Sequence, residues 1–79
     1  MRRRTVTKNF RGKERPGPFS YTFSVGDELV LLHYGGENDE QFAVFARLTD
    51  VQNCALQQQE PSPRYEASKD LFDSSTAEA

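Results

Sequence analysis

The side chains that most often perform catalysis are scarce in this sequence of 79 residues, which contains one histidine, His33, and one cysteine, Cys54. His33 ends the most apolar segment and no acidic residue is placed as its catalytic partner, so we interpret it as a structural residue at the end of a strand. Cys54 has no basic neighbour that would stabilise a thiolate, which favours a small buried thiol over a nucleophile. A single Cys with a single His also cannot form a structural zinc site.

Metal and phosphate chemistry has equally little support in the sequence. The acidic residues Glu37, Asp39 and Glu40 could bind a hard cation, but their spacing is not that of a calcium-binding loop. The same acids follow Gly35-Gly36 and would repel a phosphate there, and the sequence has neither a Walker loop nor a dinucleotide-binding glycine pattern. We therefore predict a non-enzymatic protein that binds no metal and no cofactor.

Charge is the feature that points to a partner. The whole chain has a net charge of -2, yet residues 1–15 carry seven basic residues against Glu14 alone, a charge of +6, and residues 16–79 carry -8. A dense basic segment beside an acidic body is typical of a segment that docks on an anionic partner, although it can also serve only to keep a terminus soluble. The predicted partner-binding residues are Arg3, Arg4, Lys8, Phe10, Arg11, Lys13 and Arg15.

The apolar residues are concentrated in the middle of the chain. Fifteen of the twenty Phe, Tyr, Leu and Val residues lie between Phe19 and Leu56. This distribution predicts a basic N-terminal arm at 1–15, a small β domain at 16–59, and a Pro-containing linker with an acidic C-terminal tail at 60–79. Residues 1–9 and 73–79 are polar, and we expect both ends to be poorly ordered in the free protein.

The clearest secondary-structure signal runs from Phe19 to Val25, where aromatic residues or Val alternate with Ser or Thr. Strict alternation with a period of two residues predicts a strand with one buried face and one solvated face. Pro16 and Pro18 predict an extended lead-in to this strand, and Gly26-Asp27 predicts a turn after it.

Three further segments complete the central part. Residues 28–34 contain four consecutive aliphatic residues and predict a strand that is covered on both faces. The glycine-rich, acidic stretch 35–40 predicts a turn. Residues 41–51 fit either a strand or a helix, and their Val, Phe and Thr content favours the strand.

These patterns predict a mainly β fold: a small antiparallel sheet or partly open barrel of three to five strands, with one short C-terminal helix and mobile termini. Residues 52–59 fit a fourth strand or a short helix, and residues 66–72 fit the C-terminal helix with Leu71 and Phe72 as its apolar contacts. The predicted core consists of Phe19, Tyr21, Phe23, Val25, Leu29, Leu31, Phe42, Val44 and Leu48.

A β domain of this size predicts self-association. A unit of about 40 residues is near the lower limit for independent folding, and a small open sheet leaves a strand edge unpaired. We therefore expect a homodimer or another stable assembly, in which a second copy covers that edge and buries Phe45 or Val30.

The stretch from Val25 to Leu32, followed after a polar turn by Phe42 to Val51, resembles the central hairpin of ASCH domains, which are small β-barrels related to PUA domains. The resemblance covers about a third of the chain, and the same pattern occurs in SH3-like barrels. It implies a small barrel with a nucleic-acid-binding surface near Lys13 and Arg15. Where that family has a Gly-x-Lys-x-x-Glu-x-Arg segment, this sequence has the shorter run 12–15.

Three functional hypotheses follow from these observations. The favoured one is a small protein-binding regulator or inhibitor, of the kind that compact viral genomes encode, acting on a nucleic-acid-handling host protein or complex. The alternatives are a nucleic-acid-binding module, which uses the basic arm and stacks Phe10 or Tyr21 on a base, and a structural subunit of a larger assembly. The acidic charge of the whole chain favours a protein partner over naked nucleic acid.

The sequence also bears on location. No apolar run approaches the ~18 residues of a membrane-spanning helix, and no apolar region follows Arg2, Arg3 and Arg4 as it would in a secretory signal. We therefore expect no membrane association, and a protein of the cytoplasm, nucleoid or nucleus that is not secreted.

Overall fold

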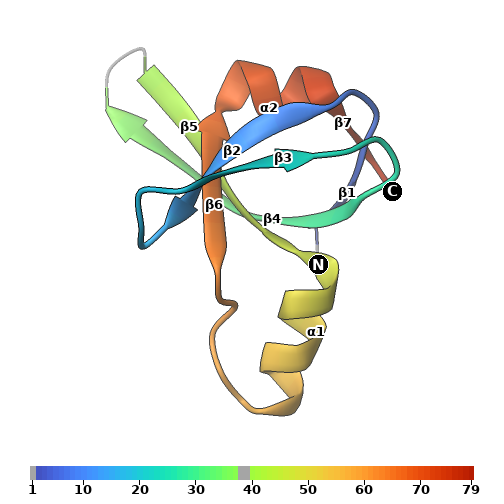
Figure 1. The fold of residues 1–79 in the computed structure, drawn as a ribbon, viewed down its shortest axis with the longest axis vertical. Helices are drawn as coiled ribbons and strands as arrows, with labels where there is room; N and C mark the ends of the chain where they lie inside the picture. The colour runs from blue at the N-terminus through green and yellow to red at the C-terminus, as the bar shows by residue number, and fades with distance from the viewer. Residues whose placement is uncertain (1, 38–39) are drawn as a thin grey trace.

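The computed structural model describes residues 2–37 and 40–79, which form one curved antiparallel sheet and two short helices (Figure 1). The mainly β fold predicted from the sequence is therefore confirmed. The strands are β1 (Arg2–Val6), β2 (Phe10–Arg15), β3 (Ser20–Phe23), β4 (Glu28–Glu37), β5 (Glu40–Arg47), β6 (Arg64–Ser68) and β7 (Thr76–Glu78), and the helices are α1 (Leu48–Leu56) and α2 (Lys69–Ser75).

The sheet has seven strands in the order β3-β2-β6-β5-β4-β1-β7, rather than the predicted three to five. All six strand pairs are antiparallel. The difference arises in the flanking segments, because β1, β2, β6 and β7 all lie outside the region between 16 and 59 that was expected to form the sheet.

Both ends of the chain belong to the sheet, which corrects the predicted arm, tail and mobile termini. β1 lies between β4 and β7, and β2 lies between β3 and β6. Residues 73–75 end α2, residues 76–78 form β7, and Met1 lies outside the described residues. At the N-terminal end, the burial of Val6 at 1% exposure and Phe10 at 4% offsets part of the entropic cost of ordering the segment.

The alternating segment forms β3, but its burial differs from the prediction. Phe23 is 1% exposed, whereas Phe19, Tyr21 and Val25 are exposed to 65%, 39% and 63%. The reason is the position of β3 at an edge of the sheet, where only the residue nearest the centre reaches the other core side chains. The alternating pattern determines which side chains point to the same face of the sheet. The edge position of the strand determines how much of that face other side chains cover.

The hairpin of β4 and β5 is longer than the sequence predicted. Residues 35–37 continue β4 and Glu40 begins β5, so the predicted turn is wrong for these positions, while residues 38 and 39 lie outside the described part. Gly35 faces Phe42 across the hairpin, and a Cβ at Gly35 would lie 2.7 Å from Phe42 Cζ. The glycine therefore makes room for the ring, which is half-buried against the strand instead of lying in the predicted core.

The two helices follow β5 and β6 directly. The strand expected for 41–51 is correct up to Arg47, after which residues 48–56 form α1, so the helical alternative holds for most of 52–59. Figure 1 shows α1 projecting from one end of the sheet and α2 lying across the other end. The expected C-terminal helix begins at Lys69 instead of Glu66, and it buries Phe72 completely while Leu71 stays 41% exposed.

The core is built on five aromatic rings from five elements: Phe10 on β2, Phe23 on β3, Phe45 on β5, Tyr65 on β6 and Phe72 on α2. Their ring centroids lie between 4.8 and 6.1 Å apart in stacked, tilted and edge-on pairs. Leu29, Leu31, Val44 and Leu48 are buried as predicted. Val30 and Phe45 are buried within a single chain, at 4% and 0% exposure, and need no second copy to cover them.

Replacing Phe23 with Ala should lower the free energy of unfolding by ~3–5 kcal/mol, because the ring is buried against three other rings. Urea unfolding followed by circular dichroism measures the change. The control is Leu56→Ala at the end of α1, where the side chain is 85% exposed and the change should stay within about 0.5 kcal/mol. Equal losses in the two variants would contradict the assigned core.

Candidate partner-binding surface

The predicted binding residues on β2 are divided between the two faces of the sheet. Arg11 and Lys13 are exposed on its outer face, whereas Phe10 points inward and is 4% exposed. The Phe10 ring packs against Phe23, Phe45 and Phe72. It is therefore a core residue, and the hypothesis that it stacks on a base or contacts a partner is wrong.

Arg3 and Arg4 of β1 form contacts with neighbouring elements of the fold. Arg3 pairs with Glu28 of β4 at 3.1 Å. Arg4 is half-buried, donates from Nε to the Thr76 hydroxyl at 3.0 Å, and lies with its guanidinium 5.6 Å from the centre of the Phe72 ring. These contacts connect β1 to its neighbours, so Arg3 and Arg4 act first as structural residues.

Four cations gather on the outer face of β2 and β6: Arg11, Lys13, Arg15 and Arg64, which we call the cation row. The strand register places Lys13 opposite Glu66 and Arg15 opposite Arg64. Arg15 pairs with Glu66 at 3.0 Å. Among the ion pairs between side chains of residues 2–36 and 40–79, none within 4.0 Å involves Arg11, Lys13 or Arg64.

The structure therefore brings together three of the seven predicted residues, Arg11, Lys13 and Arg15, while Lys8 lies exposed in the turn between β1 and β2. Sequence reasoning missed Arg64, which lies 49 positions after Arg15 in the chain but directly opposite it in the sheet. Only the pairing of β2 with β6 reveals this neighbour, and nothing in the local sequence around Arg64 signals it.

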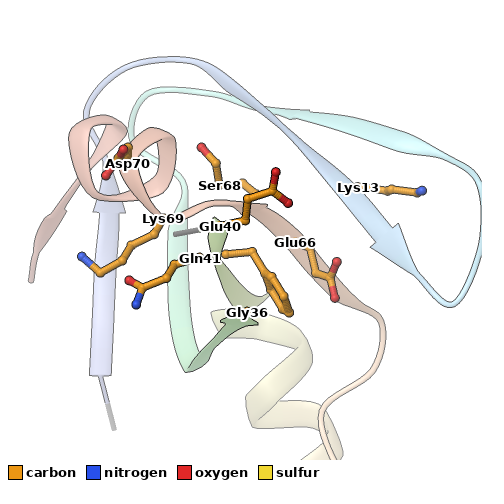
Figure 2. Close-up of a pocket in the computed structure, with 10 residues that line it drawn as sticks. Lys13, Gly36, Glu40, Gln41, Glu66, Ser68, Lys69 and Asp70 are labelled. Atoms are coloured by element: carbon orange, nitrogen blue, oxygen red, sulfur yellow. The ribbon is translucent and has the colours of Figure 1, made fainter. Parts of the chain in front are cut away.

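A groove of about 1100 Å³ adjoins the cation row at Lys13 (Figure 2). Its lining mixes charges and apolar groups: Lys13, Gly36, Glu40, Gln41, Phe42, Glu66, Ala67, Ser68, Lys69 and Asp70. Figure 2 shows the amino groups of Lys13 and Lys69 pointing away from each other, so the charged groups do not converge on one point. This arrangement suits contact with an extended surface better than the binding of a single small ion.

A polar network anchors α2 at the far side of this groove. Asp73 accepts hydrogen bonds from Tyr34 Oη at 2.7 Å and from Lys69 Nζ at 2.8 Å. Burial raises the pKa of the Asp73 carboxyl, but the hydrogen bonds from Lys69 and Tyr34 outweigh it and the pKa lies below its usual value. Burial, together with the bond to Asp73, raises the pKa of the Tyr34 phenol.

The inner face of β3 holds a different cluster. The guanidinium of Arg47 lies 5.3, 5.9 and 5.4 Å from the ring centres of Tyr21, Phe23 and Tyr65. Burial raises the pKa of the Tyr65 phenol, although the charge of Arg47 opposes the shift. Tyr21 is thus engaged by Arg47 on the face opposite to Arg11, which argues against the predicted stacking of Tyr21 on a base beside the cation row.

The residues with chemical reactivity lie apart from the cation row. His33 is exposed on β4, with Nδ1 3.4 Å from the Tyr34 carbonyl oxygen. Cys54 is half-buried on α1, and its thiol lies 3.8 Å from the Ser62 carbonyl oxygen. In the part of the chain that the structure describes, no three His, Cys, Asp or Glu side chains form a candidate metal site. Neither α1 nor α2, the helices among these residues, is long and apolar enough to cross a membrane.

Comparison with protein-family models, with curated proteins and with solved structures gives no match to this chain. The resemblance of the central hairpin to ASCH domains therefore remains a prediction, and function has to be argued from the geometry of the chain itself.

The Asp73 network makes the stability of the fold depend on acidity. Because the pKa of folded Asp73 lies below its ordinary value of 3.8, the network contributes stability above about pH 4 that is lost as the pH falls through the folded pKa. Asp73→Asn should lower the urea midpoint at about pH 6, and by a smaller amount at about pH 2.5, where more of the folded carboxyl is protonated. Asp70→Asn, which removes a carboxylate from the first turn of the same helix, is the control. A midpoint loss in Asp73→Asn that is the same at both pH values would contradict the role of the carboxylate.

Proposed function

We propose that this protein is a non-enzymatic protein-binding module that recognises an acidic surface of its partner through the cation row. The observation that carries the proposal is that alternation within β2 and its register with β6 place four cations on one face with a single acidic residue, Glu66, among them. Arg11 and Lys13 follow each other at alternate positions of one strand, so both side chains leave the sheet in the same direction.

The sheet supplies the rigidity that such a surface needs. β2 is paired on both sides, with β3 and with β6, and its inward residues Phe10 and Gly12 are buried in the core. The backbone positions of Arg11, Lys13 and Arg15 are therefore fixed before a partner arrives. A pre-organised row loses only side-chain freedom on binding, which reduces the entropic cost of association.

A protein partner is favoured over nucleic acid by what surrounds the row. Single-stranded nucleic acids are held by aromatic stacking as well as by charge, and the two rings expected to stack are committed elsewhere, Phe10 to the core and Tyr21 to Arg47. The groove next to Lys13 adds Glu40, Glu66 and Asp70, which would repel a phosphate backbone. A partner with acidic and basic side chains can match this mixed border, and a small module that occupies such a surface acts as a regulator or an inhibitor.

Substituting Arg11, Lys13 and Arg15 together with Ser should weaken binding to an acidic protein surface about tenfold, since each exposed charge pair contributes ~0.2–1 kcal/mol. Fluorescence anisotropy with a labelled polyglutamate peptide, at low and at physiological salt, measures the change. The control replaces Arg2, Arg3 and Lys8 with Ser, which removes the same charge from the other end of the sheet and from the turn after β1.

The proposal requires the two triple variants to differ, with the β2 variant the weaker binder. Equal weakening would mean that only total charge matters and would overturn the cation row. Duplex DNA of random sequence serves as the competing probe. Tighter binding to DNA than to the peptide, with a salt slope near -0.9 per phosphate contacted, would assign the row to nucleic acid instead.

A further inference from the structure

The edge strand β3 is open along its outer side. Within residues 2–37 and 40–79 it pairs with β2 alone, and it ends the sheet. Its residues Ser20, Tyr21 and Thr22 are exposed, as is Phe19 immediately before it. An exposed edge with unpaired amide and carbonyl groups is a template for another strand.

The hydrogen-bond ladder identifies the backbone groups that are free on this edge. Glu14 donates from its amide to the Phe19 carbonyl at 2.8 Å, one position beyond the pairing of Lys13 with Ser20. Hydrogen-bonded and non-hydrogen-bonded pairs alternate along an antiparallel ladder, so Tyr21 also directs its backbone groups towards β2. Ser20 and Thr22 direct theirs to the open side.

The free stretch is limited at both ends. The Ser24 amide donates to the Asp27 carboxylate at 2.9 Å, and the Ser24 carbonyl accepts from the Asp27 amide at 3.0 Å. At the other end, Pro18 has no amide hydrogen to donate. Within β3, the unpaired donors and acceptors therefore belong to Ser20 and Thr22, which lie symmetrically about Tyr21.

From this symmetry we propose that β3 pairs with β3 of a second copy, antiparallel and centred on Tyr21. In this register Ser20 of each copy lies opposite Thr22 of the other, so all the free amide and carbonyl groups of both strands are satisfied at once. Tyr21 then faces Tyr21 of the second copy across a twofold axis. A twofold interface of this kind uses one surface patch twice and closes on itself as a dimer.

The same register covers Phe19, one of the large apolar side chains that a single chain leaves exposed. Phe19 of one copy comes opposite Phe23 of the other, beside a groove of about 480 Å³ that Phe23, Arg47 and Leu48 help to line. Phe19 is 65% exposed in the single chain, so its ring has a large apolar surface that dimerisation would remove from water. In a single chain only Phe23 of the alternating apolar residues is fully buried, whereas in the dimer Phe19, Tyr21 and Phe23 of both copies form a continuous apolar face.

Charge permits this approach. Residues 16–26 contain no charged side chain. The nearest members of the cation row are Arg11 and Lys13 on β2, and the cations of the two copies are separated by three strand spacings, about 14 Å. This distance exceeds the Debye length of about 8 Å at physiological salt, so their repulsion is largely screened.

The dimer would also affect the proposed function, although the dimer proposal stands independently of that function. A twofold axis perpendicular to the sheet leaves both outer faces on the same side, so two cation rows lie on one continuous surface. A partner with a long acidic surface could then contact both rows, which raises avidity without any new contact within each copy.

Sedimentation equilibrium from about 10 to about 500 µM tests the dimer, because interfaces of this small size dissociate in that range. The wild-type chain should approach twice its mass of 9.0 kDa. Thr22→Pro removes an amide hydrogen on the open side while keeping the pairing with β2, so it should shift the monomer–dimer midpoint upward at least tenfold. Thr22→Ala keeps the amide hydrogen and should dimerise like the wild type.

Wild-type protein that stays at 9.0 kDa throughout would overturn the proposal, as would equal dimerisation of Thr22→Pro and wild type. Because the proline variant could misfold, disulfide trapping in a Cys54→Ser background gives a second measurement. Tyr21→Cys should form a covalent dimer, since the two Cα atoms would lie ~4.5 Å apart across the axis. Ser20→Cys should not, because its Cα atoms would be about 8 Å apart. Equal trapping at both positions would contradict the register.

Discussion

The packing of aromatic rings against the backbone of β2 is the contact on which the rest of the structure depends. A Cβ at Gly12 would lie 2.8 Å from Phe23 Cε2 and 3.0 Å from Phe45 Cζ, so the two rings occupy the space that a side chain would fill. These rings come from β3 and β5, and Tyr65 and Phe72 extend the cluster to β6 and α2. One position without a side chain thus allows elements far apart in sequence to share a core, and the strand that packs against these rings is the one that displays the cation row.

The local parts of this fold can be read from the sequence, while its assembly cannot. Alternation identified β3, the aliphatic run identified β4, and Val and Phe content identified β5, because each signal lies within one short segment. The strands of the charged ends gave no such signal. β1 contains three Arg and β6 is half polar, and each becomes a strand because neighbouring strands pair with it on both sides.

The same distinction applies to the candidate site. The sequence predicted Arg11, Lys13 and Arg15 as partner-binding residues, and the structure places all three exposed on one face of β2. The sequence grouped Phe10 and Arg4 with these exposed cations. In the structure, strand alternation directs Phe10 to the inner face, and the contact of β1 with β7 half-buries Arg4. Arg64 joined the row only through the pairing of β6 with β2. Charge density along the chain predicts that a basic surface exists, and strand pairing decides which residues form it.

The strand order governs how the chain can fold as it leaves the ribosome. β1 must wait for residues 28–31 before it gains its first partner and for residues 76–78 before it gains its second, and β2 is enclosed only after residues 64–66 have emerged. Contacts between segments so distant in sequence form late, because the loops that they close are long. The nascent chain therefore presents cationic strands that are paired on one side only for much of its synthesis. Their positive charge at that stage keeps growing chains apart before the sheet encloses them.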